Sequence, residues 1–191
     1  MSESQWDKRY ESVLEPGQPC DALLRYPHLL PKSGRALDLA CGLGANALFL
    51  AQHGLTTEGW DASTVALAKL ATFAAQQGTS IHTEQRDVEA SPPETNSFDV
   101  IVVSNFLHRA TFPQLLSALR PGGLLYYQTF IKDKSPDIGP GNPDFLLDNN
   151  ELLRLAAPLR ILAYHEEGTI GDRRQGFRHQ AMLVGCKETD A

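Results

Sequence analysis

The sequence predicts an α/β protein with a single seven-stranded, mostly parallel sheet, helices on both faces and an antiparallel last strand. Short apolar runs alternate with segments of helical periodicity along most of the chain, which is typical of successive strand-helix units. A glycine-rich turn joins the first strand to the helix after it. The last two apolar runs are joined by a link too short for a parallel crossover, and they therefore predict an antiparallel hairpin.

Composition limits the functional classes. The 191 residues carry 23 acidic and 17 basic side chains, for a net charge of −6, which argues against a broad nucleic-acid-binding face. The three cysteines are too few and too scattered for a disulfide framework or a zinc site. No apolar run approaches the roughly 20 residues that cross a bilayer. We expect one cytoplasmic domain of residues 1–191, monomeric or homodimeric, without a membrane segment, a bound metal or a nucleic-acid partner.

The N-terminal segment carries two aromatic residues around a cation, Trp6, Arg9 and Tyr10, and then a Pro16-Gly17-Gln18-Pro19 breaker. Aromatic side chains often anchor terminal segments, so we expect an amphipathic helix laid over the core. A second helix is predicted over Asp21 to Leu30, where a proline ends it.

The first predicted strand, Arg35 to Leu39, leads through a glycine turn into a helix over Asn46 to His53. Gly42 and Gly44 permit positive φ and leave no Cβ between the backbone and a ligand. The spacing also satisfies the loose glycine pattern of dinucleotide sites, but Asp38, four residues before Gly42, would repel a pyrophosphate. A carboxylate at this place suits a ligand that carries positive charge.

The string Asp38-x-x-Cys41-Gly42-x-Gly44 resembles the first motif of class I S-adenosylmethionine-dependent methyltransferases. Their cofactor has an ammonium group and a sulfonium and no phosphate, and their Rossmann-like sheet has an antiparallel last strand. The resemblance therefore implies S-adenosyl-L-methionine as the cofactor. It covers residues 35–186, which would form the core.

Asp61 follows the second predicted strand, Thr56 to Trp60, and stands 23 residues beyond Asp38. In nucleoside-binding α/β units, an acidic residue at about this spacing accepts hydrogen bonds from the ribose hydroxyls. The alternative is that Asp61 only caps the next helix, Ser63 to Gln77.

The third predicted strand, Ile81 to Arg86, ends at Asp87-Val88. The resemblance implies that Asp87 meets the adenine amino group and that the Val88 amide meets a ring nitrogen; the alternative for Asp87 is a surface residue after a strand. Ser91 to Glu94 is a loop where related folds often place a helix. We therefore expect thin cover over the sheet there.

The most apolar strand, Phe98 to Val103, is followed by the polar residues Ser104, Asn105, His108 and Arg109. Ligands of open α/β sheets lie at the carboxyl ends of strands beside a topological switch, so these side chains should face the transferred methyl group. We take Asn105, His108 and Arg109 as catalytic candidates. His108 is either a general base or a helix-start residue. Arg109 pairs either with an anionic acceptor or with a nearby carboxylate.

A helix over Phe112 to Leu119 and a strand over Leu124 to Phe130 flank the turn Arg120-Pro121-Gly122-Gly123. This turn strongly resembles the one before the fifth strand of methyltransferases. Ile131 to Asp144 is long for a connection in a compact domain, and it is a candidate lid or acceptor-site loop.

The chain is predicted to end in a helix and a hairpin. These elements are expected over Asn149 to Ala157, Leu159 to Glu166 and Phe177 to Cys186. The link of the hairpin contains a basic cluster, Arg173, Arg174 and Arg178, which is either a solvated loop or the rim of a site for an acidic substrate.

The Trp6 to Tyr10 segment is similar to the lid of the tellurite-resistance and thiopurine-methyltransferase-like branches. This implies that residues 1–30 fold over the cofactor and that Arg9 and Tyr10 line the acceptor pocket. The chain has almost no inserted sequence, so we expect a small-molecule acceptor, such as a thiol or a chalcogen oxyanion like tellurite. The cofactor-binding residues that the resemblance implies are Asp38, Ala40, Gly42, Gly44, Asn46, Asp61, Ala62, Asp87, Val88 and Ser104.

Two other functions stay open. An NAD(P)-dependent reductase would require Asp38 to be tolerated near a pyrophosphate, and the chain lacks the usual catalytic Tyr-x-x-x-Lys pair. A non-catalytic S-adenosylmethionine-binding protein would keep the cofactor pocket, and Asn105, His108 and Arg109 would then be replaceable.

Overall fold

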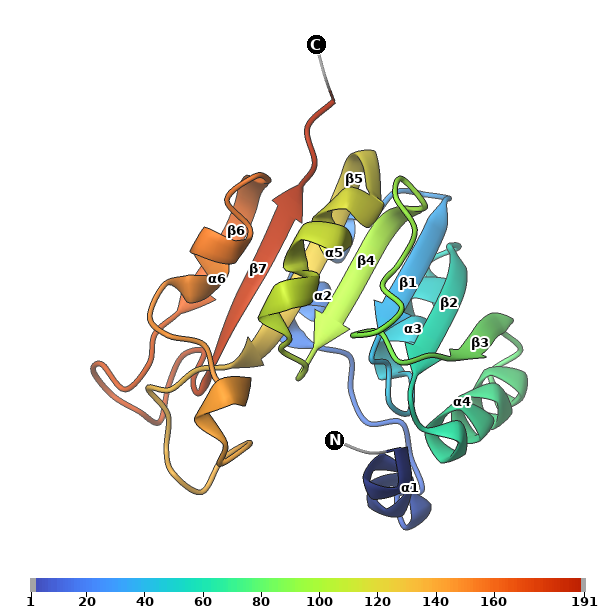
Figure 1. Ribbon diagram of the computed structural model, residues 1–191, viewed down its shortest axis with the longest axis horizontal. Helices are drawn as coiled ribbons and strands as arrows, with labels where there is room; N and C mark the ends of the chain where they lie inside the picture. Colours follow the sequence, from blue (N-terminus) through green and yellow to red (C-terminus); the bar gives the residue numbers. More distant parts are fainter. Residues whose placement is uncertain (1–2, 190–191) are drawn as a thin grey trace.

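The computed structural model describes residues 3–189 and has the predicted α/β architecture (Figure 1). Residues 1, 2, 190 and 191 of the predicted domain lie outside the described residues. The strands form one seven-stranded sheet in the order β3-β2-β1-β4-β5-β7-β6. Their bounds are β1 (Arg35–Leu39), β2 (Thr56–Asp61), β3 (Ile81–Gln85), β4 (Phe98–Ser104), β5 (Leu119–Phe130), β6 (Arg160–Glu166) and β7 (Gln180–Cys186).

The direction of the strands confirms the predicted hairpin. β1 to β5 pair in parallel, whereas β7 is antiparallel to both β5 and β6. The strand order reverses between β1 and β4, which is the topological switch where ligands of such sheets bind.

Helices cover both faces of the sheet, as predicted (Figure 1). The central strands are apolar on both sides, because residues 100 and 102 of β4 enter one core cluster and residues 101 and 103 enter the other. The first cluster lies under α2 and α3, with α4 packed against α3, and the second lies under α5 and α6. The helix bounds are α1 (Glu3–Glu11), α2 (Asp21–Arg25), α3 (Ala45–Gln52), α4 (Thr64–Gln76), α5 (Phe112–Ala118) and α6 (Glu151–Leu155), with 3-10 turns η1 (Pro27–Leu29), η2 (Arg109–Thr111) and η3 (Pro143–Phe145).

Several predicted boundaries were wrong for local reasons. The helix expected over Asp21 to Leu30 ends at Arg25, because Pro27 disfavours helical geometry at Tyr26, whose φ is −125°, and a 3-10 turn follows. The helix expected over Asn149 to Ala157 shortens to α6.

The predicted turn at residues 120–123 is also drawn into β5. The amide of Gly122 donates to the carbonyl of Lys187 at 2.7 Å, and the amide of Lys187 donates to the carbonyl of Gly123 at 2.9 Å. These two hydrogen bonds continue the pairing with the chain beyond β7. Since Leu119 also pairs with Phe98 of β4, β5 begins at Leu119.

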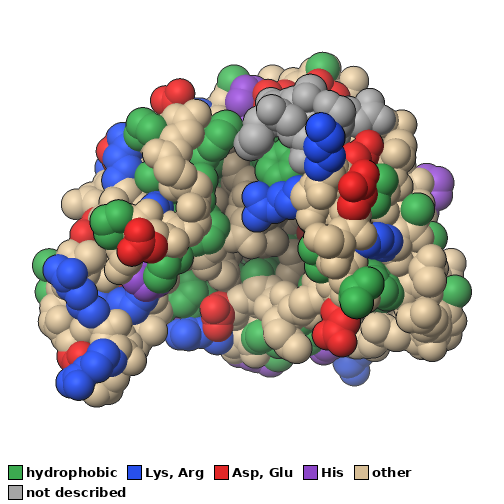
Figure 2. Space-filling view, turned by 90° about the horizontal axis from the view of Figure 1, so that it is seen from below, with side chains coloured by type: hydrophobic (Ala, Val, Ile, Leu, Met, Phe, Trp, Pro, Cys, Tyr) green, Lys and Arg blue, Asp and Glu red, His purple; other side chains and the backbone are tan. Residues whose placement is uncertain are grey.

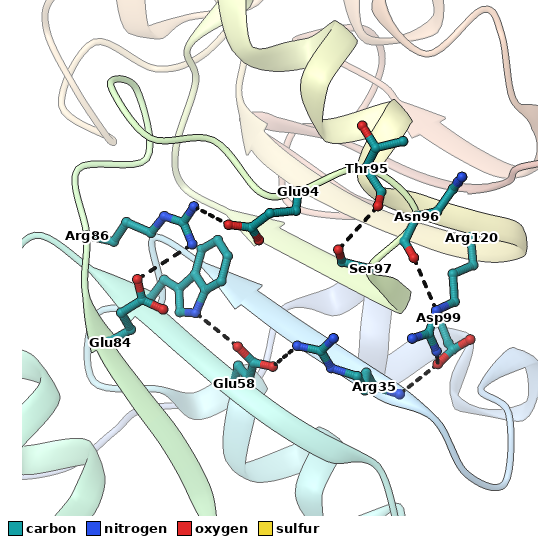
Figure 3. Close-up of polar contacts among 11 residues, drawn as sticks. Arg35, Glu58, Glu84, Arg86, Glu94, Thr95, Asn96, Ser97, Asp99 and Arg120 are labelled. Atoms are coloured by element: carbon teal, nitrogen blue, oxygen red, sulfur yellow. Dashed lines mark hydrogen bonds and ion pairs between the residues drawn. The ribbon is translucent and has the colours of Figure 1, made fainter.

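The segment between β3 and β4 is a loop, as predicted, and polar side chains cover the sheet where a helix is missing (Figure 3). The Arg86 guanidinium lies 4.0 Å from the centre of the Trp60 ring. It also donates to the carbonyls of Ser91 (2.8 Å) and Pro92 (3.0 Å) and pairs with Glu94 at 2.9 Å. One arginine thus ties the loop to the buried Trp60 ring on β2.

The N-terminal helix α1 docks on α4 near the carboxyl ends of the strands (Figure 1). The Lys69 ammonium group of α4 donates to the carbonyls of Tyr10, Glu11 and Val13 at 2.6 to 2.8 Å, which satisfies the open carbonyls at the end of α1. The Asp7 carboxylate accepts from the Ser63 hydroxyl at 2.6 Å. None of the helices in the described part of the chain has the length and hydropathy to cross a membrane.

Candidate functional site

A cleft of about 1110 Å³ opens at the carboxyl ends of the parallel strands. Figure 2, which looks at the molecule from below the view of Figure 1, shows this face hollowed at its centre. The volume is slightly above the roughly 300–1,000 Å³ typical of ligand pockets, so there is room for more than one small molecule. The lining comes from α1 and the segment after it, from the loops that follow β1 to β4, from the end of β5 and from the loop after it.

The glycine turn after β1 forms the middle of this cleft. Ala40, Gly42 and Gly44 have φ values of +56°, +53° and +77°. A Cβ at Gly44 would lie 2.2 Å from a Leu70 methyl group, so this glycine lets α3 and α4 pack. A Cβ at Gly42 would lie 2.8 Å from the Tyr10 hydroxyl, so this glycine keeps space beneath α1.

Asp38 is fully buried and lies behind the lining of the cleft. Its carboxylate accepts from the Ala47 amide at 3.0 Å and from Asn46 Nδ2 at 3.3 Å. Burial raises the pKa of Asp38 to about 8, although the hydrogen bonds from Asn46 and Ala47 oppose the rise. Asn46 lines the cleft and also donates to the Ser104 hydroxyl at 3.0 Å, so it connects the buried carboxylate to the cleft.

Asp61 lines the cleft and also organises the two turns beside it. Its carboxylate accepts from the Gly42 amide at 2.8 Å and from the Ser63 amide at 2.9 Å. Burial raises the pKa of Asp61 above its ordinary value, although the hydrogen bonds from the Ser63 and Gly42 amides oppose the rise. Ser63, rather than Asp61, is the cap of α4, because its hydroxyl accepts from the Ala66 amide. A carboxylate has about four lone-pair sites, so Asp61 keeps capacity for a ligand.

The other predicted cofactor residues also lie at the cleft. Asp87 accepts from the amides of Glu89 (3.0 Å) and Ala90 (3.3 Å), which shapes the turn after β3. Val88, half-exposed Ala62 and Ser104 line the same side.

The predicted acceptor residues Arg9 and Tyr10 line the cleft from α1. Burial, and then the nearby Asp61, raise the pKa of Tyr10 to about 12, so its phenol is a neutral hydrogen-bonding group. The Arg9 guanidinium lies 5.6 Å from the centre of the Trp6 ring.

The three catalytic candidates separate in the structure. Asn105 lines the cleft, whereas His108 and Arg109 are outside its lining. His108 Nε2 lies 3.7 Å from the carboxylate of Glu89, which does line the cleft. The buried His108 Nδ1 has no hydrogen-bond partner among the described residues.

Arg109 makes the ion pair that we considered as its alternative. Its guanidinium binds the Glu151 carboxylate twice, at 2.6 and 2.9 Å, and donates to the carbonyls of Asp144 (2.7 Å) and Leu146 (2.9 Å). This pairing holds the pKa of Glu151 below its ordinary range. Arg109 therefore ties the predicted lid loop to the carboxyl end of β4.

The basic cluster of the last hairpin is a solvated loop with internal partners. Arg178 donates to the backbone carbonyls of the loop, and Arg174 pairs with Asp172 at 2.9 Å. Sequence reasoning missed the aromatic part of the cleft, which is supplied by Phe106, Phe130 and Phe145. Phe130 is the last residue of one predicted strand and Phe106 lies three residues beyond another, so both could have been found from the sequence, whereas the position of Phe145 depends on how the long loop folds back.

The fold and the cleft define a class. A parallel sheet with an antiparallel seventh strand, and a glycine turn and two acidic strand ends around a single cleft, are the features of class I methyltransferases that the sequence had predicted. Residues 36–123 match a family model described as a methyltransferase domain.

Proteins of similar sequence are also named methyltransferases. A 2-heptyl-1-hydroxyquinolin-4(1H)-one methyltransferase of Mycobacteroides abscessus is 30% identical over 66% of this chain and 60% of its own length. A probable S-adenosyl-L-methionine-dependent methyltransferase, TehB of Haemophilus influenzae, is 27% identical over 86% of this chain and 57% of its own length. The chain thus spans only a little over half of these curated relatives.

Solved structures share the fold over nearly the whole chain. The crystal structure of TehB from Haemophilus influenzae has a TM-score of 0.69 at 21% identity and covers 97% of this chain and 67% of its own. A second structure, described by the words "Conversion of a Disulfide Bond into a Thioacetal Group during Echinomycin Biosynthesis", has a TM-score of 0.75 at 20% identity. The match covers 99% of this chain and 93% of that one. Residues 36–123 thus match a methyltransferase domain, and the chain as a whole has the fold of the class I methyltransferases, whose cofactor is S-adenosyl-L-methionine.

Proposed function

We propose that this chain transfers a methyl group from S-adenosyl-L-methionine to a small-molecule acceptor bound in the same cleft. The observation that carries the proposal is the cleft itself, which joins the glycine turn, Asp61 and Asp87 to the aromatic side chains at the ends of β4 and β5. We further propose that residues 1–191 act as one methyltransferase domain, with residues 1–30 as a lid over the core of residues 35–186.

The polar groups in the β1 to β3 half of the cleft, together with Ser104 at the end of β4, fit the cofactor. Asp61 has free lone pairs for the ribose hydroxyls, and Asp87 with the Val88 amide suits the adenine edge. Gly42 allows the cofactor to lie against the backbone, where Ala40, Gly44 and Ala62 shape the turns. Asn46 and Ser104 are polar groups for the methionine end, backed by the buried carboxylate of Asp38.

The chain has a small set of tasks in the reaction. Bound S-adenosyl-L-methionine supplies an activated methyl group on its sulfonium. Arg9 and Tyr10 on α1, together with the aromatic side chains of the opposite wall, would hold the acceptor in line with that group and exclude water. His108 is the proposed base for an acceptor that must lose a proton. Because His108 lies behind the cleft lining, the proton would reach it by way of Glu89 on the cleft wall, whose carboxylate is 3.7 Å from His108 Nε2. We assign Arg109 no contact with the acceptor, because Glu151 and two carbonyls occupy its guanidinium.

The alternatives have less support. The buried Asp38 lies directly behind the glycine turn, where its ionised form favours a cationic cofactor over the pyrophosphate of an NAD(P)-dependent reductase. A non-catalytic S-adenosylmethionine-binding protein would not need an aromatic compartment beside the cofactor half of the cleft. Thiols and chalcogen oxyanions such as tellurite are the first acceptors to test, since the TehB resemblance suggests them.

The test is a transfer assay with methyl-labelled S-adenosyl-L-methionine and a panel of thiols, aromatic hydroxyl compounds and tellurite. We expect labelled product with one acceptor class. His108→Ala should lower kcat by about 10²-fold with cofactor affinity unchanged, whereas His53→Ala, on the exposed end of α3, should match the unmodified protein. A normal rate in His108→Ala would make His108 structural, and no labelled product with any acceptor would contradict the proposed activity.

A further inference from the structure

A chain of hydrogen bonds links the start of α2 to the cleft through three side-chain amides. The Ala22 backbone amide donates to Gln128 Oε1 at 3.0 Å. Gln128 Nε2 donates to Gln180 Oε1 at 2.7 Å, and Gln180 Nε2 donates to Asn105 Oδ1 at 2.6 Å. This amide relay crosses from α2 through β5 and β7 to the first residue after β4.

The direction of the amide relay is set at its buried end. A backbone N–H can only donate, so Gln128 must present its oxygen to Ala22 and its NH₂ group to Gln180. The same reasoning passes along the relay, and Asn105 must use its oxygen for Gln180. Asn105 Nδ2 is then the group left over, and it has no partner among the described residues.

The position of Asn105 makes this leftover donor available to a ligand. Its side chain is exposed and lines the cleft. Its backbone has a φ of +55°, and its amide donates to the Gln128 carbonyl at 2.9 Å. Gln128 is only 6% exposed, which shields the start of the amide relay from water, whereas the hydrogen bond from Gln180 to Asn105 is exposed.

A second contact from the same helix start acts on the neighbouring residue. The Cys20 amide donates to Asn46 Oδ1 at 2.9 Å, so Asn46 Nδ2 must face Asp38 and the Ser104 hydroxyl. Ser104 accepts there, which leaves its own proton free to be donated. Two consecutive residues at the end of β4 therefore present hydrogen-bond donors to the cleft.

The surroundings of Asn105 limit what these donors can bind. Phe106, Phe130, Pro140 and Phe145 provide apolar surface. The cleft as a whole is lined by four acidic residues, Glu15, Asp61, Asp87 and Glu89, and by two basic residues, Arg9 and Arg86, of which Arg86 is paired with Glu94. A small inorganic dianion would meet more carboxylates than cations there, so an organic molecule with an apolar body fits better.

We propose that Gln128 and Gln180 are positioning residues that turn the Asn105 NH₂ group toward the methyl acceptor, and that this acceptor is a flat organic molecule with a hydrogen-bond-accepting oxygen at its reactive end. The inference rests on the proposed function, because it places the acceptor in the β4 to β5 half of the cleft. An acceptor that presents N–H groups to Asn105 would be rejected, because two donors would then face each other.

The test inverts the amide relay with Gln180→Glu. A carboxylate at position 180 can only accept, so it would take the Asn105 NH₂ group and turn Asn105 Oδ1 toward the cleft. Gln180→Met removes the hydrogen bonds without adding charge. Gln114→Glu is the matched control, because Gln114 is exposed on α5, away from the cleft.

Binding is measured by calorimetry in the S-adenosylhomocysteine complex with 2-naphthol, 2-naphthylamine and tellurite, the two organic probes being neutral at pH 7. We expect the unmodified protein and Gln114→Glu to prefer 2-naphthol. Gln180→Met should lose about tenfold in 2-naphthol affinity, the equivalent of one hydrogen bond, and Gln180→Glu should reverse the preference toward 2-naphthylamine. Equal affinities for the two organic probes, absent binding of 2-naphthol, or tighter binding of tellurite would overturn the assignment of the acceptor.

The amide relay is also tested without any ligand. The side-chain NH₂ signals of Asn105 in ¹⁵N-labelled protein, identified by their loss in Asn105→Asp, should move in Gln180→Glu and stay in place in Gln114→Glu. Signals unmoved by Gln180→Glu would overturn the relay. If the S-adenosylhomocysteine complex does not form while these signals move, the proposed function fails and the relay stands.

Discussion

Two buried carboxylates at the ends of β1 and β2 dominate the chemistry of the site at the scale of single residues. Asp38 is shielded completely and Asp61 is 7% exposed. Their partners are backbone amides and Asn46, all of them neutral. Among the described residues, neither carboxylate forms an ion pair, and a positively charged cofactor would supply the missing partner.

Replacing Asp61 should weaken cofactor binding. Asp61→Ala is expected to cost about 1.5 to 3 kcal/mol of binding free energy for S-adenosyl-L-methionine, because charge-assisted hydrogen bonds to the ribose would be lost. Calorimetric titration measures this, with urea unfolding to establish that the variant is folded. Asp172→Ala, in the exposed last hairpin, is the control. Unchanged affinity in folded Asp61→Ala would remove the ribose assignment.

Cofactor binding should be coupled to a proton on Asp38. The pKa of Asp38 is raised from 3.8 to about 8 by burial, so the folded, ligand-free protein holds this proton at pH 7 and the unfolded chain does not. This group therefore makes the free energy of unfolding fall as pH rises from about 4 to about 8. A cation bound nearby favours the ionised form and lowers that pKa, so affinity for S-adenosyl-L-methionine should rise with pH up to about 8.

The number of protons released on cofactor binding is measured by repeating the calorimetric titration at pH 7 in two buffers with different heats of ionisation. We expect net proton release in the unmodified protein and almost none in Asp38→Asn. Asp21→Asn, an exposed acid on α2, should behave like the unmodified protein. The same heat in both buffers would show that Asp38 keeps its proton when the cofactor binds.

At the scale of elements, the sequence predicted what local pattern determines. The apolar runs and the glycine turn placed the strands within a few residues, since alternation and turn chemistry are encoded locally. Side-chain contacts between segments that are far apart in the sequence could not be predicted from these local patterns. The partner of Arg109 is 42 residues away, and the Gln180 contact of Asn105 spans 75 residues. Both depend on how the loop after β5 and the last hairpin return to the end of β4.

The loop between β3 and β4 should depend on Arg86 for its stability. The Arg86 side chain is only 14% exposed and joins the Trp60 ring to two loop carbonyls. Arg86→Ala is expected to lower the free energy of unfolding by about 2 to 3 kcal/mol, through the lost cation–π contact and the unpaired carbonyls. Urea denaturation measures the loss.

Matched variants separate these contributions. Arg86→Lys keeps the charge but not the planar fork, and it should fall between Arg86→Ala and the unmodified protein. Glu94→Ala should change stability little, because Glu94 is 66% exposed and such ion pairs contribute little. A change of less than about 0.5 kcal/mol in Arg86→Ala would mean that the loop does not need this side chain.

At the scale of the whole molecule, one sheet supports two adjoining compartments. The turns after β1, β2 and β3 form the polar half of the cleft, and the ends of β4 and β5 form the aromatic half. The topological switch between β1 and β4 lies between them, and α1 closes over the polar half through Lys69 and Asp7. This arrangement explains how so short a chain could hold a cofactor beside a small acceptor.

The most direct test of this account is a calorimetric titration of the protein with S-adenosyl-L-methionine, S-adenosylhomocysteine and NADH in parallel. We predict that the first two bind with one site per chain and that NADH does not bind. Binding of NADH alone would contradict the role given to Asp38 and would assign the cleft to a nicotinamide cofactor.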